Sequence, residues 1–160
     1  MDWLMDWLMD IAIFVHVLCG VLLAMTLIIM QLVVNPAMAK IPAGDGKLQA
    51  AAVIQGRWHP VVDGAIILLT ATALLFFTVR WDEIVASHIL HLKVTTGIIT
   101  LTAASLLHFY FRGVKKRLKA NGETEKLAKV NTFTSKLEKT ALIFGFLTFL
   151  SALFYNHSPL

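Results

Sequence analysis

Four polar side chains lie inside otherwise apolar stretches, where they could bind a cofactor or carry charge. They are His16, Asp63, His91 and Lys93. A charged side chain near the centre of a bilayer costs about 2.5 kcal/mol or more, so each of these residues is a candidate for a functional role. A neutral imidazole nitrogen can bind a metal, and an ammonium group can neutralise a carboxylate. Together these residue types predict a cofactor site between membrane helices.

The elements that would position these residues are four apolar stretches, at about 11–34, 60–79, 84–111 and 136–155. Hydrophobic residues make up 58% of the chain and charged residues only 15%, which is too little polar surface for a soluble domain. About 20 apolar residues in a helix cross a hydrocarbon core of about 30 Å. We therefore predict an all-α fold, an integral membrane four-helix bundle in the lipid bilayer, with residues 1–160 forming a single domain.

The basic residues predict how this bundle is oriented. Nine of the fourteen Lys and Arg residues lie between Arg112 and Lys139, in and beside a predicted cytoplasmic loop at 112–135. The first connection is also basic, whereas the N-terminal segment is acidic and has no Lys or Arg. Because basic loops stay in the cytoplasm, we expect the N-terminus and the C-terminus outside, in a multi-pass protein of a bacterial inner membrane. The same rule explains the isoelectric point near 9.4 without a nucleic-acid partner.

The basic segment has its own helix signals. Asn121-Gly122 is typical of a helix end. Ser135 and Glu138 have the spacing of a capping box, so we predict that the fourth helix begins near Ser135. The residues between these two signals are expected to form a solvated loop that touches lipid.

The chain opens with the unit Met-Asp-Trp-Leu written twice. Trp3 and Trp7 are one helical turn apart and suit the aromatic belt at the outer membrane interface. The methionines and aspartates of the repeat, together with His16, Cys19 and Met25, suggest an alternative chemistry, because thioethers and thiolates are soft ligands for copper. A copper-handling membrane protein is therefore one alternative function.

Two histidines on different predicted helices are expected to lie at a similar depth in the membrane. His16 and His91 lie five and seven residues from the outer ends of their predicted helices, so they should be at similar depth. Facing histidines of a helix bundle bind b-type haem as axial ligands to the iron. Gly20, one turn after His16, would leave room for the macrocycle. The sequence thus predicts one haem b between the first and third helices.

His59 and His108 share a depth near the cytoplasmic side and form a second candidate pair, with Asp63 close by. His91 and His108 are 17 residues apart, which places them about 100° apart around one helix. A second, inner haem is therefore less favoured than the outer one. Asp63 also has a simpler explanation, because it lies in the predicted first turn of the second helix, where an acid interacts favourably with the helix dipole.

Three segments resemble a superfamily of four-helix membrane proteins. The segments "FVHVLCGVLLAMTLIIMQLVVNPAMAKIP" and "GRWHPVVDGAIILLTATALL" look like the first helix and the entry to the second helix of the CopD-like proteins. The segment "HLKVTTGIITL" resembles the His-x-Lys motif of the HemJ-type protoporphyrinogen oxidases, which bind haem. The resemblance maps the helix-one histidine of that family onto His16, and its helix-three histidine and lysine onto His91 and Lys93.

The residues and the resemblance together predict a haem b-binding inner-membrane protein in electron transfer or protoporphyrinogen oxidation. Lys93 would pair with a carboxylate of haem or of a porphyrin substrate and so have a catalytic role, and electrons would leave to quinone. The sequence leaves open whether the chain is an enzyme with oxidoreductase activity. It also leaves open whether the chain forms a homo-oligomer. Besides copper handling, the remaining alternative is a structural or assembly subunit without a cofactor.

Overall fold

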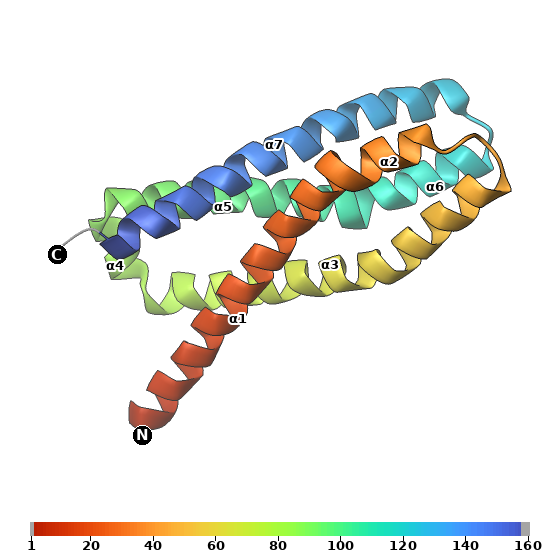
Figure 1. The fold of residues 1–160 in the computed structure, drawn as a ribbon. Coiled ribbons are helices and arrows are strands. Elements are labelled where there is room, and N and C mark those ends of the chain that lie inside the picture. The colour runs from red at the N-terminus through yellow and green to blue at the C-terminus, as the bar shows by residue number, and fades with distance from the viewer. Residues whose placement is uncertain (1, 158–160) are drawn as a thin grey trace. The chain divides into compact units, whose positions relative to one another are not determined.

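The chain is almost entirely helical. The computed structural model describes the backbone of residues 2–157 and the side chains of residues 3–154, and no strand occurs within that range (Figure 1). In chain order the elements are α1 (Asp2–Ile29), the π-helical segment η1 (Met30–Val34), α2 (Asn35–Lys40), α3 (Asp45–Val79), α4 (Trp81–Ala86), α5 (His88–Ser105), the π-helical segment η2 (Leu106–Phe111), α6 (Arg112–Ala120) and α7 (Thr124–His157). The prediction of an all-α fold is confirmed.

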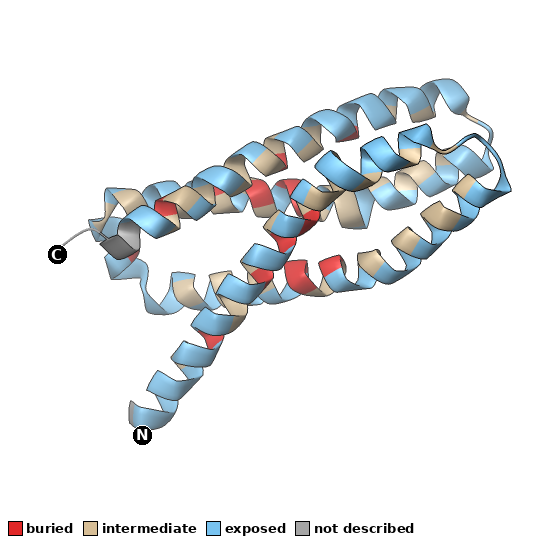
Figure 2. Ribbon diagram, in the orientation of Figure 1, coloured by how far each residue is buried: buried red, intermediate tan, exposed pale blue. Residues whose placement is uncertain are grey.

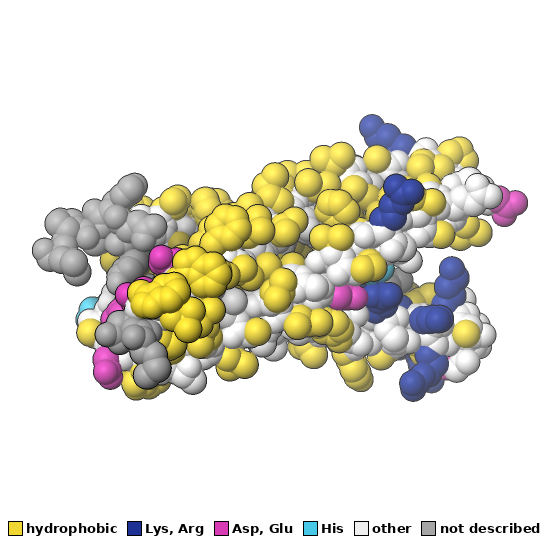
Figure 3. Space-filling view, turned by 90° about the horizontal axis from the view of Figure 1, so that it is seen from below, with side chains coloured by type: hydrophobic (Ala, Val, Ile, Leu, Met, Phe, Trp, Pro, Cys, Tyr) yellow, Lys and Arg dark blue, Asp and Glu magenta, His cyan; other side chains and the backbone are white. Residues whose placement is uncertain are grey.

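Four continuous helical stretches are long and apolar enough to cross a membrane. They are Trp3–Lys40, Asp45–Val79, His88–Ala120 and Thr124–Phe154. At most 22% of the apolar window in any of them is buried, so most of the apolar side chains face outward. Figure 3 shows these side chains spread along the helices on the face that it draws. A water-soluble domain would bury them, so this surface indicates a lipid environment and a multi-pass membrane protein.

The helices extend well beyond the apolar stretches. α3 begins at Asp45, 15 residues before the predicted start, and continues through Pro60. α7 begins at Thr124, so the predicted start near Ser135 is wrong, and Ser135 and Glu138 lie inside the helix. Residues 45–59 include three alanines and two glutamines, and residues 124–135 include two lysines, which are residue types that favour a helix in water as well as in lipid. Apolar runs therefore locate the spans but not the ends of the helices.

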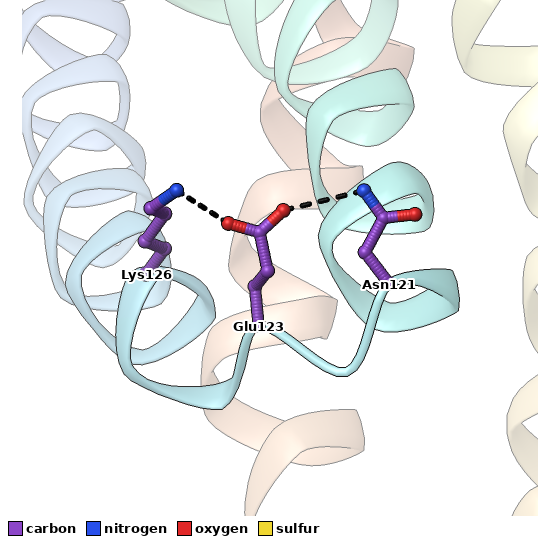
Figure 4. A network of polar contacts seen from close by, with 3 residues as sticks. All are labelled: Asn121, Glu123 and Lys126. Atoms are coloured by element: carbon purple, nitrogen blue, oxygen red, sulfur yellow. Dashed lines mark hydrogen bonds and ion pairs between the residues drawn. The ribbon is translucent and has the colours of Figure 1, made fainter.

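The predicted loop at 112–135 is reduced to a turn between α6 and α7. Gly122 has φ +70°, a left-handed conformation that favours glycine, and it confirms the predicted helix end at Asn121-Gly122. Glu123 accepts a hydrogen bond from Asn121 at 3.2 Å and forms an ion pair with Lys126 at 2.5 Å (Figure 4). The hydrogen bond from Lys126 is the largest cause that lowers the pKa of Glu123, because it stabilises the ionised carboxylate.

The predicted helix at 84–111 is interrupted. α4 ends at Ala86, and Ser87 takes an extended conformation with φ −115° and ψ 117°. The side chain of Ser87 accepts a hydrogen bond from the backbone N–H of Leu90 at 3.4 Å and caps the N-terminus of α5 at His88. Depth along this helix is therefore measured from His88, four residues later than the predicted start.

The chain divides into two compact units, which we call the first unit, up to Leu75, and the second unit, from Phe76 onward. In the second unit α5 lies beside α7 (Figure 1). Five small or hydroxyl-bearing residues make contacts between these two helices, and we call them the α5–α7 seam: Thr96, Gly97, Thr100, Gly145 and Thr148. Small residues let membrane helices approach closely, and hydroxyl groups form hydrogen bonds between them.

The first unit contains α1, η1, α2 and most of α3. Its buried residues occupy short parts of α1 and α3 (Figure 2): Ala12, Cys19, Leu23, Thr26, Val62, Ala65 and Ile66. After α2 the chain turns, and the ammonium group of Lys47 donates a hydrogen bond to the carbonyl oxygen of Ile41 at 3.2 Å. This contact ties the start of α3 to the turn before it.

Candidate functional site

His16 is the candidate residue with the best-defined surroundings. It is half-buried on α1, and its ring nitrogen Nδ1 lies 2.8 Å from the hydroxyl oxygen Oγ1 of Thr72 on α3. The same oxygen lies 2.9 Å from the carbonyl oxygen of Leu68 and 3.1 Å from that of Leu69. Both carbonyl groups belong to the turn of α3 that precedes Thr72. The hydroxyl group therefore links the imidazole to the backbone of the neighbouring helix and restricts the orientation of the ring.

Gly20 lies one turn after His16 on the same side of α1. A Cβ atom placed on Gly20 would meet no heavy atom within 4 Å. By contrast, a Cβ atom on Gly97 would lie 3.6 Å from the Thr148 methyl group, and one on Gly145 would lie 3.4 Å from the Thr100 methyl group. The position beside His16 is thus open, as it is at most other glycines of the chain, and it would not obstruct a bulky ring.

The copper alternative would need His16, Cys19 and Met25 on one side of α1. Within the described part of the chain, no group of three His, Cys, Asp or Glu side chains is placed to hold a metal ion. Met25 follows His16 by nine residues in the regular helix α1, which places the two about 180° apart around its axis. These two side chains therefore cannot bind one ion unless the helix unwinds. Met1 of the opening repeat lies outside the described residues.

His91 and Lys93 lie near the start of α5. His91 is exposed and occupies the first turn, where its backbone N–H donates to the carbonyl oxygen of Ser87 at 3.0 Å. Lys93 is half-buried and lies five residues, about 7.5 Å, from the start of α5, closer to the helix end than the predicted helix at 84–111 implies. Because His16 and His91 belong to different units, their pairing across a haem stays a prediction.

The second candidate pair is also divided between the units. His59 and Asp63 are half-buried and share a side of α3, four residues apart. Asp63 lies 18 residues after the start of α3, so its predicted place in a first helical turn is wrong, and the helix dipole does not explain it. His108 is half-buried in η2, and π-helical segments often occur at functional sites. The inner pair of His59 with His108 stays a prediction.

Sequence reasoning missed Thr72. It considered charged residues and histidines, and it overlooked hydroxyl groups, which cost little inside a membrane helix because they bond to their own backbone. A signal was present, since a histidine inside a helix bundle needs a hydrogen-bond partner and the second apolar stretch holds Thr70 and Thr72. That stretch also holds Thr78. Which of the three threonines meets His16 depends on the packing of α1 against α3, which the sequence pattern does not give.

The function has to be argued from this geometry. The resemblance to the CopD-like and HemJ-type proteins rests on three short segments and stays a prediction. No protein-family model matches the chain, and neither the curated proteins nor the solved structures include a match to it.

Proposed function

We propose that the chain is a haem b-binding membrane protein in which His16 is an axial ligand to the iron. The contact of His16 with Thr72 between two apolar helices is the observation that carries this proposal. A histidine ligand needs a fixed ring orientation and a hydrogen-bond partner for the nitrogen that does not bind the metal. Thr72 supplies both to His16.

The surroundings of His16 fit a haem group. Gly20 leaves space on the same side of α1, and the buried residues Ala12 and Leu23, one turn before and two turns after His16, are apolar. Bound haem b would supply a one-electron redox couple, so the class of function is electron transfer. The chain itself would bind the iron through His16, orient that ligand through Thr72 and exclude water with apolar side chains.

The further parts of this proposal come from the sequence. His91 would provide the second axial nitrogen, and Lys93 would neutralise a haem propionate or a porphyrin carboxylate, which accounts for an ammonium group in an apolar helix. Electrons would pass to quinone, or a porphyrin would be oxidised, as the resemblance to the HemJ-type oxidases implies. A bacterial inner membrane, with both termini outside, suits either reaction.

An absorption spectrum tests the proposal directly. The purified protein in detergent, titrated with ferric haem, should develop a Soret band that saturates at a fixed stoichiometry, and reduction should give the α-band of haem b. His16→Ala should lose this band because alanine offers no ligand atom. His88→Ala is the matched control, since it removes an exposed imidazole at the start of α5 that has no part in the proposal, and it should keep the band.

The same measurement separates the alternatives. A protein that gives no Soret band with haem but retains Cu(I) against a chelator would contradict the proposal and favour copper handling. A protein that binds neither would favour a structural or assembly subunit. His16→Ala that binds haem as tightly as the unaltered chain would show that the ligand lies elsewhere.

A further inference from the structure

We infer that Thr72 is a positioning residue that fixes His16 in one tautomer, with the proton on Nδ1 and the lone pair on Nε2, so that Nε2 is the atom that binds the iron. This inference rests on the proposed function for the role of Nε2, whereas the tautomer itself is a property of the chain alone. It assigns a role to Thr72, a residue whose side chain carries neither a charge nor a typical metal-binding group.

The hydrogen atoms on the three groups decide the tautomer. The hydroxyl group of Thr72 has one proton, and its oxygen lies 2.9 Å from the Leu68 carbonyl oxygen and 3.1 Å from the Leu69 carbonyl oxygen. When this proton goes to the backbone, Oγ1 keeps its lone pairs and can accept a hydrogen bond. Nδ1 of His16, at 2.8 Å, must then be the donor. The chain of donors runs from imidazole to hydroxyl to carbonyl, and both protons have an acceptor.

The membrane makes this arrangement more selective than it would be in water. In hydrocarbon a buried N–H group without an acceptor costs several kcal/mol, whereas in water a solvent molecule would take the place of Thr72. The hydroxyl oxygen is also held in place, because it bonds to the backbone of the preceding turn of its own helix. Thr72 thus offers His16 an acceptor at a fixed point on α3.

The choice of tautomer has a consequence for the metal. A hydrogen bond from the distal ring nitrogen to an acceptor raises the basicity of the nitrogen that binds the iron. Stronger electron donation favours the ferric state and lowers the reduction potential. Thr72 is a neutral acceptor, so its effect should be smaller than that of a carboxylate, yet its loss should raise the potential and weaken binding of haem by about 10- to 100-fold.

Three variants isolate the hydroxyl group. Thr72→Val removes it and keeps the branched shape, and Thr72→Ser keeps it. Thr70→Val is the matched control, because Thr70 is half-buried on the same helix and its hydroxyl donates to the Ile66 carbonyl oxygen at 2.7 Å. All three side chains resemble one another in size, so loss of folding should not confuse the comparison.

The tautomer is read without haem, by 15N NMR of the protein labelled on its histidine ring nitrogens, with His16→Ala used to assign the signals. We expect His16 to show a protonated Nδ1 and an unprotonated Nε2 in the unaltered chain, in Thr72→Ser and in Thr70→Val. Thr72→Val should give a mixture of tautomers. Haem titrations and redox titrations of the same four proteins should then show weaker binding and a raised potential in Thr72→Val alone.

Two results would overturn the inference. One is a protonated Nε2 on His16 in the unaltered chain, which would mean that Thr72 donates to Nδ1. The other is a Thr72→Val protein with the same tautomer as the Thr70→Val control. Failure of the proposed function looks different, because the unaltered chain would then fail to bind haem while the NMR spectrum still reports the tautomer.

Discussion

α5 and α7 are joined by Thr96 and Thr148, whose hydroxyl oxygens lie 2.9 Å apart, whereas α1 and α3 are joined by Thr72 and His16 at 2.8 Å. In the α5–α7 seam both partners are hydroxyl groups that also lie within hydrogen-bonding distance of their own backbone, Thr96 at 2.8 Å from the Leu92 carbonyl oxygen. Both hydroxyl protons therefore have acceptors inside the helix pair. Between α1 and α3 one partner is an imidazole, which has a second nitrogen.

This difference separates a packing contact from a candidate ligand. A hydrogen bond between two hydroxyl groups stabilises a helix pair and offers nothing to a metal. A hydrogen bond from an imidazole orients a group that can bind iron through its other nitrogen. The glycines of the two contacts also differ, since a Cβ atom added to Gly97 or Gly145 would meet a threonine methyl group whereas one added to Gly20 would meet no heavy atom within 4 Å. The contact of His16 with Thr72 in the first unit is therefore the better candidate for a ligand site, and the contact of Thr96 with Thr148 in the second unit is explained by packing alone.

The largest expected effect is loss of haem from a variant of the second unit, and it would contradict the contrast between the two units. If His91 is the second axial ligand, His91→Ala should lose the Soret band as completely as His16→Ala does, and the second unit then has more than a structural role. The absorption spectrum of the reduced protein measures this. A His91→Ala protein with an unchanged spectrum would confine haem ligation to the first unit and would leave the pairing of His16 with His91 without support.

Substitutions of Gly145 and Gly20 test whether the two helix contacts differ in their effect on stability. Gly145→Leu should destabilise the protein by about 1–3 kcal/mol, because a Cβ atom there already lies 3.4 Å from the Thr100 methyl group and a larger side chain overpacks the seam. Gly20→Leu should leave stability nearly unchanged but weaken haem binding, because it fills the space beside His16. Unfolding in mixed detergent micelles and haem titration measure the two effects. Equal destabilisation by both substitutions would show that Gly20 is a packing residue as well.

Lys93 tests whether charge in the second unit serves the cofactor. Lys93→Met keeps the approximate side-chain volume and removes the ammonium group, so it should preserve the Soret band and change the reduction potential or slow turnover. Lys93→Arg keeps the charge and should have a smaller effect. A Lys93→Met protein that loses haem while His91→Ala retains it would identify lysine as the ligand.

A smaller effect is expected from the hydroxyl groups of the seam. Thr96→Val removes the acceptor of the bond from Thr148 and should cost about 0.6 kcal/mol of stability, the average for hydrogen bonds between membrane helices. It should leave the haem spectrum unchanged. Thr72→Val should do the reverse, with an altered spectrum or potential and little loss of stability. Two variants with the same profile would remove the distinction between the helix pairs.

The sequence predicts the parts of this structure that depend on apolar periodicity and charge. It finds four spans and the helix end at Gly122, because a bilayer demands apolar length and a left-handed turn favours glycine. It misses the start of α3 at Asp45 and of α7 at Thr124, because polar helices that leave the membrane look like loops in a search for apolar runs.

The candidate site is less predictable for a related reason. His16 stands out as a histidine in an apolar helix, but Thr72 is 56 residues away in the chain and is one of three threonines in the second apolar stretch. Only the packing of α1 against α3 decides which of them the imidazole meets. An unbroken helix over 84–111 would place His91 at the depth of His16, but the break at Ser87 places it in the first turn of α5.

The smallest effect concerns the water-exposed end of the second unit. Because the folded-state pKa of Glu123 lies below its ordinary value of 4.5, its interactions stabilise the fold fully above that value, and the contribution is lost as pH falls through the lowered folded-state pKa. Glu123→Gln should therefore be slightly less stable than the unaltered chain near neutral pH and equal to it in acid, with the difference reduced by salt. Chemical unfolding as a function of pH, in a double-mutant cycle with Lys126→Met, isolates the pair. A difference that widens toward acid pH would contradict the assigned role of Glu123, and any change in the haem spectrum would show that this turn communicates with the candidate site.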